Sequence, residues 1–183
     1  VYTPRLLDLL RKYGAKATFF VVGVHAEQHP ELLRRMAEEG HDIGIHNYVH
    51  KTNWLMRPGT VKKQIARTSG IIEQATGVKP VYYRPPWCIV NLFDFANLGY
   101  LQIILWSAMF GDWRKRVGVE RLTARMLKKL RPGEVLLLHD CGRTFGADED
   151  APENMLQALE VYLQRGTGRG YRFVTIGEMI ALT

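Results

Sequence analysis

Two histidines separated by three residues, His46 and His50, carry the clearest signal for chemistry in this sequence. They follow an alternation of Ile43 and Ile45, which predicts a short strand with His46 directly after its end. On a helical turn this spacing puts both imidazoles on one face, within reach of a single ion. Imidazole is the commonest protein ligand for borderline divalent metals such as zinc. A catalytic site also needs a third ligand, and an isolated pair is more often two ordinary polar residues.

Arg84 follows an aromatic strand and precedes two consecutive prolines, Pro85 and Pro86, and then Trp87. Prolines restrict the backbone as it leaves the sheet, so the arginine would be held rigidly. A guanidinium held in this way can pair with a buried carboxylate in a fixed geometry. A surface arginine beside a structural turn explains the same residues equally well.

His139 follows a wholly apolar run, Val135–Leu138, which places it at the end of a predicted strand. Histidine in such a position is a natural general acid or base near neutral pH. Asp112 lies in a loop after another predicted strand, where its carboxylate could orient an imidazole. Local sequence alone favours a simple turn aspartate at this position.

The elements that must position these residues alternate regularly between apolar, β-rich runs and amphipathic runs. We predict strands at 17–22, 42–45, 81–83, 101–106, 134–138 and 172–175. We predict helices at 3–13, 29–39, 58–75, 92–97, 119–130, 152–164 and 176–182. This alternation indicates an α/β fold with a mainly parallel sheet. Polar residues after several strands are typical of a barrel-like α/β enzyme.

Composition excludes several classes of protein. The chain has 183 residues, enough for one domain, and its net charge of +7 favours anionic surroundings. The basic residues are scattered over predicted helices without interleaved aromatics, so we expect no nucleic-acid partner. No apolar run reaches the ~18 residues of a membrane span. Two cysteines, Cys88 and Cys141, exclude a disulfide-rich scaffold and leave their own pairing open.

Four segments in register make a resemblance specific: Gly-His-Asp-Ile-Gly-Ile-His-Asn-Tyr-Val-His (40–50), Tyr-Tyr-Arg-Pro-Pro-Trp (82–87), Asp-Trp (112–113) and Leu-Leu-Leu-His-Asp (136–140). Over its whole length the chain resembles the polysaccharide deacetylases of carbohydrate esterase family four, the NodB-homology domain. The resemblance implies one domain over 1–183 and a distorted (β/α) barrel of about seven strands, six of them visible here. It also implies metal-dependent removal of N-acetyl groups from a glycan such as peptidoglycan or chitin.

The resemblance assigns a role to each residue that matches a family motif. The metal histidines fall on His46 and His50, with zinc the expected divalent cation and cobalt or nickel as alternatives. The arginine that positions the catalytic base falls on Arg84. Trp87 and Pro85 fall in the substrate groove.

The remaining matches concern proton donation and the acetyl group. The general-acid histidine falls on His139, and the aspartate that orients it falls on Asp112. Leu137 falls in the apolar pocket for the acetyl methyl group.

Three departures from the family pattern stand out. The first motif, Thr-Phe-Asp-Asp-Gly-Pro, supplies the catalytic base and the third metal ligand, and it would lie just before Val1. We therefore expect the natural protein to continue upstream, and a molecule lacking that motif to be inactive. Asn47 replaces the usual Ser or Thr, and Cys88 stands where glycine is common.

The resemblance also implies an N-acetylated glycan as partner, an extracellular or cell-wall-associated location, and a monomer. The main alternative is a catalytically inactive carbohydrate-binding module with the same fold. A metal-dependent enzyme acting on another amide is a second alternative.

Overall fold

The computed structural model describes residues 2–88 and 98–182, which group into two compact units. Unit 1 consists of Val1–Ala17 with Trp106–Thr183, and unit 2 of Thr18–Leu105. The helix predicted at 92–97 lies outside the described residues, and the single domain over 1–183 stays a prediction.

Unit 2 is built on a parallel sheet of four strands in which each strand pairs with the next one along the chain. The strands are β1 (Thr18–Val21), β2 (Asp42–Ile45), β3 (Tyr82–Tyr83) and β4 (Gln102–Ile103). Val21, Ile45, Tyr83 and Ile103 form one row of paired residues across the sheet. Because the strands are parallel, the residues that follow this row leave the sheet at the same edge.

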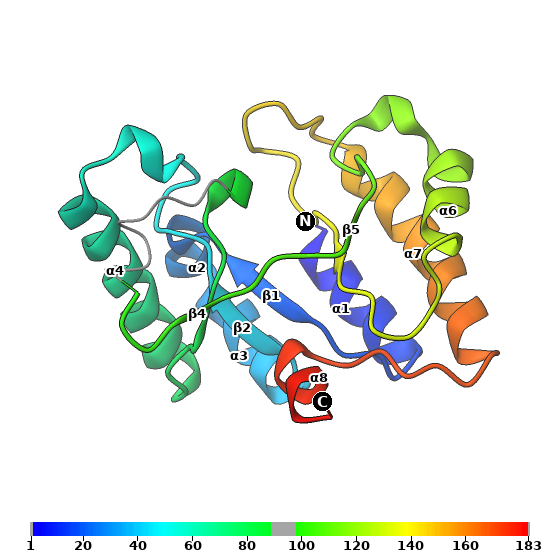
Figure 1. The fold of residues 1–183 in the computed structure, drawn as a ribbon, viewed down its shortest axis with the longest axis horizontal. Helices are drawn as coiled ribbons and strands as arrows, with labels where there is room; N and C mark the ends of the chain where they lie inside the picture. The colour runs from blue at the N-terminus through cyan, green and yellow to red at the C-terminus, as the bar shows by residue number, and fades with distance from the viewer. Residues whose placement is uncertain (1, 89–97, 183) are drawn as a thin grey trace. The chain divides into compact units, whose positions relative to one another are not determined.

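Helices and short 3₁₀ turns connect the strands of unit 2: α2 (Gly23–Gln28), α3 (Pro30–Glu38), η1 (Asn53–Leu55), α4 (Pro58–Thr76) and η2 (Pro86–Cys88). Helix α4 begins with Pro58 in its first turn and ends at Gly77, whose φ of 74° is the left-handed conformation that glycine adopts readily. Its buried Val61, Ile65 and Ile72 recur at helical spacing. Helix α4 packs against α2, α3 and β2, and Figure 1 shows its course in unit 2.

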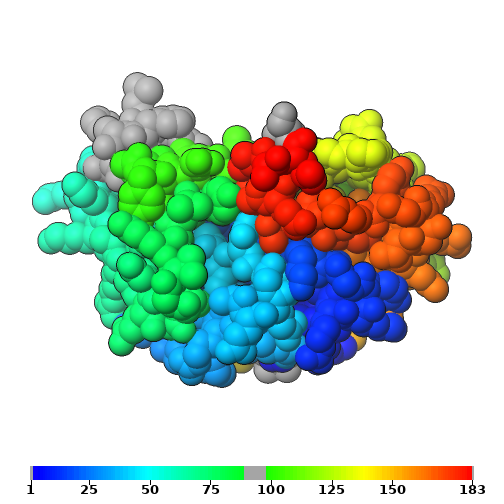
Figure 2. Space-filling view, turned by 90° about the horizontal axis from the view of Figure 1, so that it is seen from below, coloured from blue at the N-terminus to red at the C-terminus, as the bar shows by residue number. Residues whose placement is uncertain are grey.

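Unit 1 contains one parallel pair of strands and most of the remaining helices. Its elements are α1 (Thr3–Lys12), β5 (Ala108–Met109), η3 (Lys115–Val117), α6 (Val119–Leu127), β6 (Leu136–Leu137), α7 (Ala151–Thr167) and α8 (Ile176–Ala181). Helix α7 packs against both α1 and α6, and Figure 2 shows α1 in dark blue beside α7 in orange. Buried Leu7, Leu122, Met126 and Met155 belong to the core of this unit.

The predicted α/β class with parallel strands is confirmed, and the structure corrects three details. The described residues form six strands, but 172–175 is not among them. In the segment 172–175, the Phe173 carbonyl accepts a hydrogen bond from the Lys16 N–H. The segment forms no β-ladder. The structure instead has a strand that was not predicted, β5, just beyond the strand predicted at 101–106. Helix α2 was not predicted either. The described strands form no closed barrel.

No helix in the described part of the chain is both long enough and apolar enough to cross a membrane.

Gly23, the first residue of α2, lies where a side chain would collide with its neighbours. A Cβ added there would lie 2.3 Å from the Thr68 hydroxyl oxygen and 2.9 Å from the Tyr48 Cα. We therefore expect Gly23→Ala to lower the free energy of unfolding by about 1–3 kcal/mol, measured by urea denaturation.

Gly70 provides the matched control, because a Cβ at this α4 position meets nothing within 4 Å. Gly70→Ala should raise stability by about 0.5–1 kcal/mol, since alanine is the better helix former. Equal effects of the two substitutions would contradict the close packing at Gly23.

Candidate active site

The parallel sheet of unit 2 brings His46 and Arg84 to neighbouring positions, because each directly follows a strand of the paired row. The His46 N–H donates to the Val21 carbonyl at 2.9 Å, and the Arg84 N–H donates to the Ile45 carbonyl at 2.9 Å. The His46 Nδ1 lies 2.6 Å from the Arg84 carbonyl oxygen. A carbonyl only accepts, so Nδ1 carries the proton and Nε2 presents a lone pair. This is the tautomer in which imidazole binds a metal through Nε2.

His50 lies beside His46, with ring centroids 5.0 Å apart and ring planes inclined by 59°. The exposed Trp87 packs edge-on against His50, at 4.9 Å between ring centroids. The segment that joins the two histidines is a loop and not the helical turn considered above. Within this loop Asn47 has a φ of 59°, a left-handed conformation that asparagine tolerates better than most residues. The structure thus brings the two imidazoles together by a loop conformation.

Neighbouring elements hold this loop through its backbone. The N–H groups of Gly23 and Val24, at the start of α2, donate to the carbonyls of Asn47 and Tyr48, both at 2.9 Å. The Gln64 side-chain oxygen, on α4, accepts from the backbone N–H groups of Tyr48 and Val49 at 3.2 and 2.9 Å. No local pattern in the sequence marked Gln64 for this role, because α4 and the loop meet only in the folded chain.

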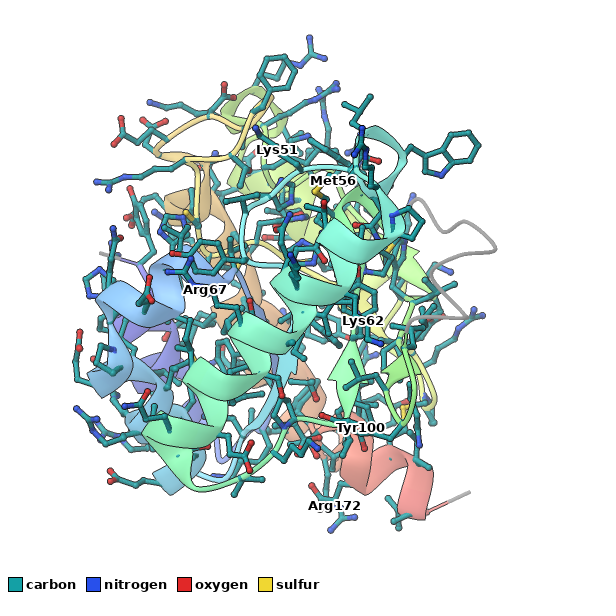
Figure 3. All side chains as sticks on the ribbon, turned by 90° about the vertical axis from the view of Figure 1, so that its left-hand side faces the viewer. Lys51, Met56, Lys62, Arg67, Tyr100 and Arg172 are labelled. Carbon is teal, nitrogen blue, oxygen red and sulfur yellow. The ribbon has the colours of Figure 1, made fainter. Side chains whose placement is uncertain are left out.

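A surface cluster supports the same loop from outside. Arg67, labelled on α4 in Figure 3, lies 3.8 Å over the Tyr48 ring and donates to both Glu27 carboxylate oxygens at 3.0 and 3.1 Å. The Tyr48 hydroxyl donates to Glu27 at 2.7 Å. These bonds lower the pKa of Glu27, the Tyr48 hydroxyl being the largest cause.

Arg84 is buried and immobilised by backbone carbonyls. Its Nε donates to the Ile104 carbonyl at 2.9 Å and its Nη2 to the Leu105 carbonyl at 3.0 Å. Its guanidinium lies 4.0 Å over the Phe20 ring. Burial lowers the pKa of Arg84 to about 10, so the group is still charged at neutral pH. Backbone carbonyls from another segment thus orient the guanidinium. The rigid placement expected from the two prolines and the pairing with a carboxylate stay predictions.

The turn after Arg84 contains buried Pro85 and two residues in the left-handed region, Trp87 at φ 54° and Cys88 at φ 50°. Left-handed backbone costs an ordinary L-residue about 1–2 kcal/mol. Burial raises the pKa of the Cys88 thiol to about 11, so this thiol is protonated at neutral pH. Both Cys88 and Cys141 are free thiols.

Unit 1 brings Asp112 and His139 together. Asp112 is 1% exposed, and its Oδ2 accepts a hydrogen bond from the His139 backbone N–H at 2.6 Å. The His139 Nδ1 lies 3.2 Å from Oδ1 of the same carboxylate, which fixes the ring orientation. Trp113 packs edge-on against the imidazole at 5.3 Å. Leu137, on the adjacent strand β6, is half-buried and pairs with Met109 of β5.

Within residues 2–88 and 98–182, no group of three or more His, Cys, Asp or Glu side chains is placed to hold a metal ion. The two imidazoles of His46 and His50 nevertheless fit a borderline divalent cation, since both rings are close and the His46 tautomer is the one that ligates. The described residues therefore contain two candidate metal ligands, His46 and His50.

Removing the Asp112 carboxylate would take away the acceptor for both the backbone N–H and the ring of His139. We expect Asp112→Ala to lower the free energy of unfolding by about 2–3 kcal/mol, because a buried donor loses its partner. Chemical denaturation measures this change. Asp8→Ala is the control, since Asp8 is exposed and forms a surface ion pair with Arg11 on α1, and it should change stability by less than about 0.5 kcal/mol. Similar losses in both variants would contradict the structural role of Asp112.

Alanine usually gives a more stable protein than glycine at the same position, but the positive φ at Cys88 reverses this order of stability. Cys88→Gly should be more stable than Cys88→Ala by about 1 kcal/mol, because only glycine adopts this backbone without steric cost. Thermal and urea unfolding of both variants measure the difference. In helix α4 the order should invert, with alanine better than glycine at position 70. A Cys88→Ala variant as stable as Cys88→Gly would show that the backbone there is unstrained.

Comparison with known proteins identifies the family of this chain. The family model described as "Polysaccharide deacetylase" matches residues 1–91. A peptidoglycan-N-acetylglucosamine deacetylase of Bacillus cereus is 33% identical over 181 residues, covering 97% of this chain and 63% of the relative. A second one from the same species is 32% identical and is covered to 82% of its length. The deacetylase PgdA of Listeria monocytogenes is 35% identical, but the chain spans only 35% of its length.

Solved structures give the same result. The peptidoglycan deacetylase PdaC of Bacillus subtilis superimposes with a TM-score of 0.87 at 29% identity, covering 98% of this chain and 83% of that one. A family 4 acetyl xylan esterase of Clostridium thermocellum, in complex with cobalt, has a TM-score of 0.87 at 33% identity, with 100% and 85% covered. A pseudoenzyme of family CE4 from Bacillus anthracis has a TM-score of 0.82 at 25% identity, with 97% and 60% covered. This chain, with its paired imidazoles and its aspartate-oriented histidine, belongs to the polysaccharide deacetylases of carbohydrate esterase family four.

Proposed function

We propose that this chain is a metal-dependent N-deacetylase acting on an N-acetylglucosamine-containing polysaccharide, with peptidoglycan as the first substrate to test. The observation that carries the proposal is the pair of imidazoles, 5.0 Å apart, with the His46 Nδ1 bonded to the Arg84 carbonyl. The similar proteins from Bacillus and Listeria named as peptidoglycan deacetylases support this choice of substrate.

His46 and His50 would hold the cation, with zinc expected and cobalt or nickel as alternatives. When bound, such a cation polarises the acetyl carbonyl and makes a water molecule a better nucleophile. The Arg84 carbonyl keeps the His46 ring in the ligating tautomer. Arg84 itself keeps its proposed role of positioning the catalytic base, and we assign no general base within this chain.

His139 would act as the general acid. In amide hydrolysis the water oxygen bonds to the acetyl carbon, the carbon–nitrogen bond breaks, and the sugar amine leaves with an added proton. The Asp112 carboxylate holds the Nδ1 side of the His139 ring, so Nε2 is the atom that would give this proton. A positioned general acid typically contributes about 10²–10⁴-fold in rate.

The substrate groove would use the exposed face of Trp87 for sugar stacking, beside Pro85. Leu137 would contact the acetyl methyl group. Because the chain acts on a wall polymer in this proposal, it would work at the cell wall or outside the cell. A monomer without a nucleic-acid partner is part of the same proposal.

Two histidine variants test these roles on the natural full-length protein, with acetate release from peptidoglycan and from N-acetylglucosamine oligomers as the assay. His139→Ala should lower turnover by at least about 10²-fold while metal content is unchanged. His46→Ala should lose both activity and metal, as measured by metal analysis after dialysis. His29→Ala, on an exposed ring, is the control and should match the wild type.

Chelator should abolish acetate release, and added zinc or cobalt should restore it. Loss of metal in His139→Ala, or activity that survives removal of the metal, would contradict the assignment. The relative rates on the two substrates decide between peptidoglycan and chitin-like glycans.

A carbohydrate-binding module without activity is the second candidate function. The observation that favours it is the similarity to the family CE4 pseudoenzyme of Bacillus anthracis, at 25% identity and a TM-score of 0.82. Glycan binding without acetate release, at any metal concentration, would establish this alternative.

A further inference from the structure

Three buried polar side chains in unit 2 form a ring of hydrogen bonds beside the histidine loop. Asn47, Asn53 and Tyr83 are 0%, 1% and 0% exposed. The Asn47 Nδ2 donates to the Asn53 Oδ1 at 2.8 Å, the Asn53 Nδ2 donates to the Tyr83 hydroxyl at 2.9 Å, and that hydroxyl donates to the Asn47 Oδ1 at 2.8 Å. We call these three residues the amide–tyrosine ring.

Every member of the amide–tyrosine ring donates one hydrogen bond and accepts one within it. Bonds arranged head to tail polarise one another, and in a dry interior each is stronger than in water. Deleting one member therefore removes two hydrogen bonds at once and leaves buried polar atoms without those partners. Such a network acts as a unit.

The positions of the ring members connect it to the candidate metal ligands. Asn47 directly follows His46, and Asn53 lies three residues after His50, so the ring ties together both ends of the histidine loop. Tyr83 precedes Arg84, whose carbonyl accepts the His46 Nδ1–H. The ring therefore links the loop to the strand end that fixes the His46 tautomer.

The backbone of Asn47 explains why the loop needs this support. Its φ of 59° is a left-handed conformation that costs an L-residue about 1–2 kcal/mol, less for asparagine. The left-handed turn is also what lets two residues four apart bring their rings to 5.0 Å outside a helix. Hydrogen bonds from the Asn47 side chain offset the cost of that turn.

We infer that the amide–tyrosine ring is a positioning device that sets the metal affinity of the His46–His50 pair. Asn47, Asn53 and Tyr83 are positioning residues that act through the loop backbone. This inference rests on the proposed function, because it requires the two histidines to bind a metal.

Tyr83→Phe is the sharpest test, because it removes one hydroxyl and keeps the aromatic ring in the core. In the natural full-length protein, zinc affinity measured by competition with a chromophoric chelator should fall on the order of tenfold. The visible absorption spectrum of the cobalt-loaded protein should change as well, since the histidine geometry relaxes. Tyr82→Phe, the neighbouring residue of β3, is the matched control and should leave zinc affinity and the cobalt spectrum unchanged.

Asn47→Gly tests the contribution of the side chain apart from that of the backbone conformation. Glycine keeps the left-handed conformation readily but lacks the side-chain amide. Its zinc affinity should fall by about as much as in Tyr83→Phe. The double variant should lose no more than either single variant, because the ring is already broken once.

The outcomes separate this inference from the proposed function. Wild-type protein that binds zinc no better than His46→Ala would overturn both. Wild-type binding that is unchanged in Tyr83→Phe, with only the melting temperature lowered, would overturn the positioning role alone. Additive losses in the double variant would likewise show that the residues do not act as one ring.

Discussion

The hydrogen bond from the His46 Nδ1 to the Arg84 carbonyl depends on the parallel pairing of β2 with β3. Ile45 and Tyr83 are register partners, so the residues after them leave the sheet side by side. A shift of one residue in this pairing would move Arg84 away from His46 and turn each side chain to the opposite face. The candidate metal centre is therefore a consequence of sheet register.

Strained backbone gathers at the same place. Asn47, Trp87 and Cys88 are the non-glycine residues with positive φ in the described part of the chain. Each lies within four residues of His46, His50 or Arg84 along the sequence. Residues held in sparsely populated conformations persist only where surrounding contacts hold them, and they concentrate at functional sites. Here the supporting contacts come from α2, from Gln64 and from the amide–tyrosine ring of Asn47, Asn53 and Tyr83.

The two halves of the proposed chemistry are supported by different means. In unit 2, the Arg84 carbonyl bonds to His46, and the amide–tyrosine ring supports the histidine loop. In unit 1, a single buried carboxylate, Asp112, binds both the backbone and the ring of His139. A neutral acceptor suits a metal ligand, which must keep a lone pair, whereas a carboxylate suits a group that has to carry a proton.

The sequence by itself determined the α/β class, most helices and strands, and which polar residues follow the strands. Local patterns sufficed for this, because apolar periodicity, proline at helix starts and glycine at helix ends act over a few residues. The motif spacing also singled out His46, His50, Arg84 and His139, and the family resemblance added Asp112. The strand expected at 172–175 failed because a β-rich segment becomes a strand only when a partner completes its ladder.

Only the tertiary structure decided how these residues meet. Asn47 adopts a left-handed turn, and backbone carbonyls of a distant segment hold Arg84. Two hydrogen bonds join the Tyr83 hydroxyl to the two asparagines. Such contacts depend on register and on the packing of α4, which no local pattern encodes. Asn53 and Gln64 are ordinary polar residues in the sequence, and their partners exist only once the chain has folded.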